Sequence, residues 1–82
     1  MPRHMKTVTL YTKSGCHLCE IVEVTLAAVG GREPFTLVRR DICEDPADFE
    51  RYKHDVPVIL IDGVEIARHR LGADRLLAAL AS

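Results

Sequence analysis

Two cysteines with two residues between them, Cys16 and Cys19, separate a β-prone run from an amphipathic run of this sequence. The preceding run, residues 8–12, alternates apolar side chains with Thr and Tyr, and the following run repeats apolar residues at helical spacing. The pair is therefore expected at a strand-to-helix junction, where it can close a disulfide within one helical turn. Unpaired backbone N–H groups and the positive end of the helix dipole favour a thiolate at such a junction.

The length of 82 residues allows one domain with one small core. We expect residues 1–82 to form that domain, with residues 1–5 as a flexible leader. Eleven Lys and Arg against twelve Asp and Glu give a net charge of -1, which supplies no field to attract nucleic acid or a membrane surface. The longest apolar stretch, residues 56–61, is too short to span a bilayer, and we find no secretory signal pattern. The expected location is therefore cytoplasmic.

The first half of the sequence predicts a βαβ unit. Residues 6–12 alternate in the way of a strand with unequal faces, and apolar residues recur at helical spacing from Cys16 to Val29. Gly30-Gly31 is able to take the positive φ of a helix stop, and residues 35–42 predict a second strand. This strand should run parallel to the first, because a whole helix connects them.

The second half predicts a short helix, a hairpin and a closing helix. Asp45 offers an N-cap for a helix that ends near His54. Residues 58–61 and 64–66 read as antiparallel strands joined by an Asp-Gly turn, and residues 72–81 carry a leucine stripe typical of a packed helix. The expected fold is α/β with the order βαβαββα, a four-stranded mixed sheet flanked by three helices.

The chemistry of the pair follows from which sulfur is ionised. Cys16 lies at the expected helix start, three residues after Lys13, and is therefore the candidate nucleophile. Cys19, inside the first turn, is the candidate resolving thiol. Glu20 and Glu23 oppose a nearby thiolate, to an extent that depends on their orientation.

Metal binding is the alternative interpretation of the pair. A zinc site needs a second close-spaced ligand pair, whereas Cys43 and the four histidines are scattered, so we expect no metal ligands within the chain. An iron–sulfur cluster shared by two chains, with Cys16 as a ligand, is the runner-up hypothesis. Cys43 itself is expected to be a small, half-buried residue. The basic run Arg68-His69-Arg70 either attracts an acidic ligand group or marks a solvated face, and the solvated face is slightly favoured.

Three separated motifs resemble those of the glutaredoxins. Residues 10–19 have the same strand, lysine, Cys-x-x-Cys and helix spacing. Residues 55–58, Asp-Val-Pro-Val, are similar to the family's Thr-Val-Pro segment with its cis-proline, and residues 71–74, Leu-Gly-Ala-Asp, are similar to its Gly-Gly-x-Asp glutathione loop. The resemblance covers nearly the whole chain and is closest to short glutaredoxin-like proteins.

This resemblance implies a thioredoxin-like fold and a thiol–disulfide oxidoreductase that uses Cys16 and Cys19. It implies that glutathione is a co-substrate and that no cofactor is tightly bound. The expected partner is a protein disulfide or a glutathione mixed disulfide, and the expected electron donor is an external reductase system. The protein is expected to be a monomer. The substrate or glutathione groove implied by the family comprises Lys13, Leu18, Val56, Pro57, Ala73 and Asp74. A second hypothesis on the same fold is an adaptor that binds partners at the Pro57 groove without turnover.

The sequence departs from the glutaredoxin pattern around this groove. His17-Leu18 replaces the usual Pro-Tyr between the cysteines, Asp55 replaces the Thr, and Leu71 replaces the first Gly of the loop. A carboxylate at Asp55 opposes the negatively charged glutathione unless Arg68 or another cation offsets it.

Overall fold

A four-stranded mixed sheet forms the centre of the molecule in a computed structural model that describes residues 5–82. In spatial order its strands are β2 (Thr36–Asp41), β1 (Thr7–Thr12), β3 (Val58–Ile61) and β4 (Val64–Arg68). β1 runs parallel to β2 and antiparallel to β3, and β3 runs antiparallel to β4. The expected order and mixed sheet are therefore confirmed, whereas the expected leader at residues 1–5 lies, except for Met5, outside the described residues.

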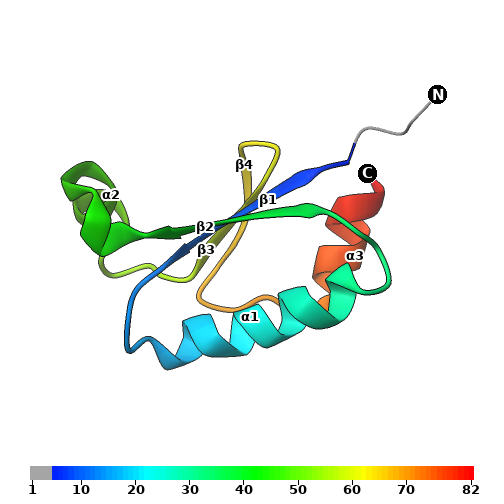
Figure 1. The fold of residues 1–82 in the computed structure, drawn as a ribbon, viewed down its shortest axis with the longest axis horizontal. Helices are drawn as coiled ribbons and strands as arrows, with labels where there is room; N and C mark the ends of the chain where they lie inside the picture. Colours follow the sequence, from blue (N-terminus) through cyan, green and yellow to red (C-terminus); the bar gives the residue numbers. More distant parts are fainter. Residues whose placement is uncertain (1–4) are drawn as a thin grey trace.

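Three α-helices flank this sheet. They are α1 (His17–Gly30), α2 (Pro46–Tyr52) and α3 (Ala73–Ala81), and a short 3₁₀ helix, η1 (Ile42–Glu44), joins β2 to α2. Figure 1 shows α1 and α3 together beside the sheet, while α2 lies at the far end of β2. No helix among residues 5–82 is long and apolar enough to cross a membrane.

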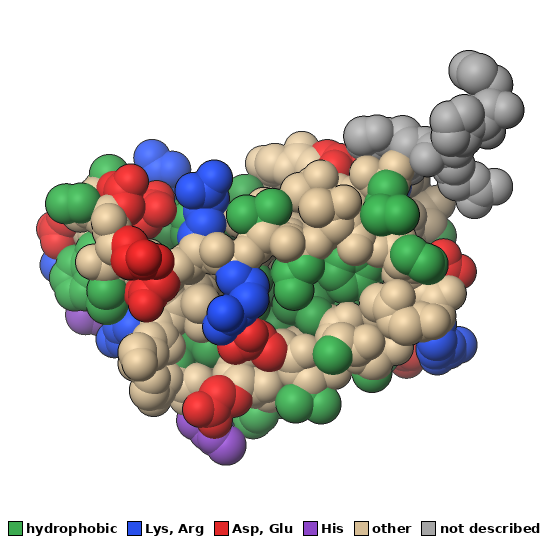
Figure 2. Space-filling view, viewed as in Figure 1, with side chains coloured by type: hydrophobic (Ala, Val, Ile, Leu, Met, Phe, Trp, Pro, Cys, Tyr) green, Lys and Arg blue, Asp and Glu red, His purple; other side chains and the backbone are tan. Residues whose placement is uncertain are grey.

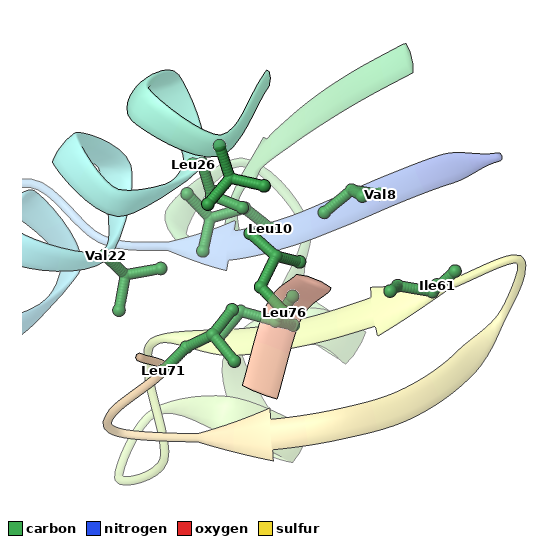
Figure 3. Close-up of a cluster of buried hydrophobic side chains, with 9 residues drawn as sticks. Val8, Leu10, Val22, Leu26, Ile61, Leu71 and Leu76 are labelled. Carbon is green, nitrogen blue, oxygen red and sulfur yellow. The ribbon is translucent and has the colours of Figure 1, made fainter. Parts of the chain in front are cut away.

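The alternation of side chains along the strands divides the core into two clusters. Figure 3 shows the larger one, in which side chains from β1, β3, α1 and α3 converge. Its buried members are Val8, Leu10, Val22, Leu26, Val29, Ile59, Ile61, Leu71 and Leu76. The smaller cluster uses the opposite face of β3 and consists of Ile42, Tyr52 and Val58, with Tyr11, Val56 and Leu60 packed against it. Because successive side chains of a strand point to opposite faces of the sheet, α1 and α3 pack on one face and α2 packs on the other.

Local polar contacts set the ends of several elements. The Asp45 carboxylate accepts hydrogen bonds from the backbone N–H groups of Ala47 and Asp48, as expected for the N-cap of α2. At the hairpin, Asp62 and Gly63 have φ values of 48° and 84°, the positive pair that a tight two-residue turn between antiparallel strands requires. Asp62 also accepts a hydrogen bond from the Thr7 N–H at 2.9 Å, which attaches the hairpin to the start of β1.

Three expectations about local structure differ from the structure. The helix stop after α1 needs no positive φ, because Gly31 stays in the right-handed helical region with φ -71° and donates back to the Ala27 carbonyl oxygen. Residue 42 does not extend β2, because Asp41 accepts a hydrogen bond from the Cys43 N–H and starts the η1 turn instead. The α2 helix also ends at Tyr52 rather than near His54.

Candidate redox site

The first turn of α1 carries the cysteine pair. Cys16 is the N-cap residue, and its Sγ accepts a hydrogen bond from the Cys19 backbone N–H at 3.1 Å. The two cysteines form a disulfide with a Cα–Cα distance of 5.2 Å. Cys16 is half-buried, whereas Cys19 is only 1% exposed. The structure thus places the pair at the expected junction, with Cys16 as the more accessible sulfur.

A tight turn between β1 and α1 orients Cys16. The Cys16 N–H donates to the Lys13 carbonyl oxygen at 3.2 Å, and Gly15 between them has φ 79°. This combination matches a type II turn, whose third position requires a positive φ and therefore favours glycine. Sequence reasoning did not assign a role to Gly15, although a Ser-Gly pair directly before a helix start is a turn signal.

The cis peptide bond between Val56 and Pro57 lies at the start of β3. Pro57 is buried and Val56 is half-buried. The Pro57 carbonyl oxygen accepts a hydrogen bond from the His69 N–H at 2.7 Å, which ties the segment to the end of β4. The cis bond is the one that the glutaredoxin resemblance implies.

Asp55, directly before this segment, is paired with cations. Its carboxylate lies 3.1 Å from an Arg68 guanidinium nitrogen and 3.7 Å from His69 Nε2. The Arg68 guanidinium also donates two hydrogen bonds to Glu65, at 2.6 and 3.0 Å. These bonds lower the pKa of the Glu65 carboxyl and raise the pKa of Arg68. All three residues of the basic run are exposed, in agreement with the slightly favoured solvated face, and Arg68 also offsets the charge of Asp55.

The remaining groove residues lie on α1 and α3. Leu18 shares a small pocket of about 160 Å³ with residues 69–72, the connection from β4 to α3. Ala73 and Asp74 are exposed in the first turn of α3, and they directly follow the pocket residue Gly72 in the sequence. The structure therefore brings Leu18 next to Leu71 and Gly72, the first half of the segment that resembles the glutaredoxin loop. Lys13 lies instead in a different pocket.

That larger pocket, of about 410 Å³, lies between the start of α1 and the ends of β1 and β2. We call it the carboxylate pocket, because its lining includes both cysteines and six charged side chains: Lys13, Glu20, Glu23, Arg39, Asp41 and Glu44. Figure 2 shows acidic and basic side chains on the visible face around the end of the molecule where α1 begins. Sequence reasoning missed the contribution of β2. The signal was available, because the carboxyl ends of parallel strands meet at one edge of a sheet.

The two glutamates expected to oppose a thiolate have different partners. Glu23 forms an ion pair with Arg39 at 2.6 Å, which offsets its charge. Glu20 lies 3.6 Å from His17 Nδ1, and both side chains are largely exposed. Glu20 is therefore the carboxylate whose charge is less compensated.

The third cysteine differs from its expected environment. Cys43 is a free thiol and is exposed rather than half-buried, because η1 turns residue 43 away from the sheet. Among residues 5–82, no three His, Cys, Asp or Glu side chains are close enough together to hold a metal ion.

The comparisons with known proteins identify the family. Residues 7–81 match the glutaredoxin-like domain family (DUF836), and the chain belongs to this family. It is 35% identical over 75 residues to the glutaredoxin-like protein YDR286C homolog of Dictyostelium discoideum, which covers 84% of this chain and 69% of that protein. The expected relationship to glutaredoxin-like proteins is confirmed.

The comparisons with solved structures establish the fold. A protein from X. campestris is 31% identical with a TM-score of 0.77, covering 90% of this chain and 95% of that one. Protein Ne2328 from Nitrosomonas europaea is 24% identical with a TM-score of 0.82, covering 98% and 96%. Oxidised mitochondrial thioredoxin 3 of Saccharomyces cerevisiae is 20% identical with a TM-score of 0.66, covering 96% and 79%. The fold is thioredoxin-like, and its disulfide-bonded pair is compatible with a redox function.

Proposed function

We propose that the protein is a thiol–disulfide oxidoreductase in which Cys16 attacks and Cys19 resolves. The reduced Cys16 thiolate attacks one sulfur of a substrate disulfide, forms a mixed disulfide and releases the other substrate half as a thiolate. The Cys19 thiolate then attacks Cys16 Sγ, releases the second half and closes the Cys16–Cys19 disulfide. Two electrons pass from the cysteine pair to the substrate, and an external thiol reductant restores the pair.

The single observation that carries this proposal is the unequal exposure of a cysteine pair that can form a disulfide. Cys16 caps the helix at its accessible end, and Cys19 is buried directly behind it. A thiolate at Cys16 gains from the helix dipole and from the Cys19 N–H that points at its sulfur. A buried second thiol suits the intramolecular step, because that step needs no access from solvent.

For the substrate, we propose a groove on the side of Cys16 that faces the cis-proline segment. Val56 offers its backbone to an extended thiol substrate, and the first turn of α3 offers free N–H groups to a carboxylate. The pairing of Asp55 with Arg68 reduces the repulsion that an isolated carboxylate would exert on glutathione. The proposed contact residues are Lys13, Leu18, Val56, Pro57, Ala73 and Asp74. Glutathione mixed disulfides and protein disulfides are both candidate substrates.

A disulfide-reduction assay with cysteine variants tests the proposal. The wild-type protein is assayed with glutathione and its reductase, and separately with thioredoxin reductase, so that the donor is identified. Cys16→Ser should abolish turnover, because the attacking sulfur is lost. Cys19→Ser should trap the mixed disulfide on Cys16, which mass spectrometry detects as an added substrate half.

The matched control is Cys43→Ser, which removes a thiol that lies outside the cysteine pair and should leave the rate unchanged. Turnover that persists in Cys16→Ser would contradict the proposal. A second pair of results would also contradict it: no turnover with either donor, and substrate binding that survives the replacement of both Cys16 and Cys19. That is the behaviour of an adaptor.

A further inference from the structure

Apart from the two cysteines and Lys13, the residues that line the carboxylate pocket have no role in the mechanism above. The pocket lies on the α1 face of the sheet, whereas the cis-proline segment starts β3 on the other side of β1. A substrate segment that extends from Cys16 toward β2 would reach this pocket rather than the glutathione loop.

The charges of the pocket do not cancel. Glu23 and Arg39 are tied to each other by their ion pair at 2.6 Å. The other charged side chains are three carboxylates and a single lysine, Lys13. The pocket is therefore net negative beside the reacting sulfurs, which favours a positively charged group over an anionic one.

A buried polar side chain provides an independent sign of a ligand. Thr12, at the end of β1, is only 7% exposed and borders the pocket. No hydrogen bond of its hydroxyl is found within residues 5–82, and no enclosed side-chain oxygen there lacks a partner, so the hydroxyl is open to the pocket and its lone pairs are available to a donor. Thr12 pairs with Asp41 across the parallel strands, so the two side chains project from the same face.

We propose that the carboxylate pocket binds an ammonium or guanidinium group next to the reacting cysteine of the substrate. Both groups carry several N–H donors and no acceptors, which matches a pocket lined by carboxylates and by the hydroxyls of Thr12 and Ser14. The preferred substrates are then peptide or protein disulfides with Lys or Arg beside the cysteine. This inference rests on the proposed function and deepens it, since the sulfur chemistry is unchanged.

Matched peptide disulfides test the preference. The protein is first reduced with dithiothreitol. It is then mixed with one of three disulfide-linked peptides, which differ only in the residue next to the cysteine: Lys, Gln or Glu. Rates are measured for a single turnover, so that no reductase is present whose own preference among the peptides could affect the result. The Lys peptide should react roughly three- to tenfold faster than the Gln peptide, the Glu peptide should react more slowly, and the differences should shrink at high salt.

Variants then locate the preference. The double variant Glu20→Gln and Glu44→Gln removes two pocket charges, and Thr12→Val removes the hydroxyl with little change of shape. Glu33→Gln removes an exposed charge outside the pocket and is the matched control. The measured quantity is the ratio of Lys-peptide to Glu-peptide rates, because loss of Glu20 also changes the reactivity of Cys16 toward every peptide. The ratio should fall several-fold in the pocket variants and stay constant in Glu33→Gln.

The outcomes separate this inference from the proposed function. If none of the peptides is reduced, the proposed function is wrong. If all three peptides are reduced at equal rates, the oxidoreductase stands and the cation site is wrong. A Lys preference that survives in the double variant would also overturn the site, because the preference would then arise elsewhere.

Discussion

Cys16 is both the N-cap residue of α1 and one half of the disulfide. Its sulfur accepts the N–H of the very residue to which it is bonded, Cys19. A capping residue usually offers an oxygen, and a thiolate in its place accepts the same N–H with a full negative charge. The local structure that ends the loop is therefore also the structure that favours the ionised sulfur.

Alkylation at different pH values measures this effect within one molecule. The fully reduced protein is treated with iodoacetamide, and the labelling of Cys16 and Cys43 is followed by mass spectrometry. Only thiolates react, so a helix N-cap position that lowers a thiol pKa moves the labelling curve to lower pH. Cys16 should reach half-maximal labelling at least about one pH unit below Cys43.

Cys43 is a suitable internal reference because it is exposed and free. In urea the helix is lost, and the two labelling curves should coincide. Curves that already coincide in the folded protein would show that the N-cap position does not activate Cys16.

At the scale of elements, the turns and caps decide where strands and helices stop. Asp62 and Gly63 both adopt positive φ in the hairpin, whereas Gly31 after α1 does not. Gly30 instead packs against Phe35, since a Cβ on Gly30 would lie 3.4 Å from the ring. Glycine therefore serves different purposes at these positions, backbone freedom at the hairpin and close packing at the end of α1.

Alanine substitutions distinguish a glycine that needs a positive φ, Gly63, from one that does not, Gly31. Gly63→Ala should lower the free energy of unfolding by about 1–2 kcal/mol, because alanine in the left-handed region is strained. Gly31→Ala should be neutral or stabilising by up to about 1 kcal/mol, because its φ of -71° suits alanine and a Cβ would meet only ordinary contacts. Urea unfolding followed by circular dichroism measures both, and equal losses would contradict the assignment of the hairpin turn.

At the scale of the whole molecule, α1 connects the redox site to the core. Its buried residues Val22, Leu26 and Val29 pack against the sheet in the larger cluster of Figure 3. Cys19 continues the same buried stripe at the site end of the helix. Packing of α1 therefore sets both the stability of the domain and the position of Cys19.

Two substitutions on α1 test this dependence on packing. Leu26→Ala should cost about 2–4 kcal/mol of unfolding free energy, because the side chain is only 1% exposed and leaves a cavity. Val24→Ala, on the outer face at 71% exposure, should change it by less than about 0.5 kcal/mol. Urea unfolding with the cysteine pair in one defined redox state measures both. Similar losses would mean that α1 does not contribute to the core through the face described.

Much of the fold was readable from local patterns. The period of two in β1, the leucine stripe of α3, the Asp45 cap and the Asp-Gly hairpin each depend on neighbours in the sequence, and the structure confirms them. The stop at Gly30-Gly31 was anticipated, but the right-handed conformation of Gly31 and the η1 turn were not. The first depends on hydrogen bonds back to the preceding turn, and the second on a carboxylate that competes with strand pairing.

The sequence by itself determined the cysteine pair, its place at a helix start and the order of the elements, because spacing and periodicity act over a few residues. The pairing of Asp55 with Arg68, and the meeting of Thr12, Arg39 and Asp41 beside the cysteines, were decided only by the tertiary structure. These groups come from strands, or in the case of Asp55 from a loop, that are separated along the chain by a whole helix or a hairpin. Their contact depends on strand order and register, which no local pattern encodes.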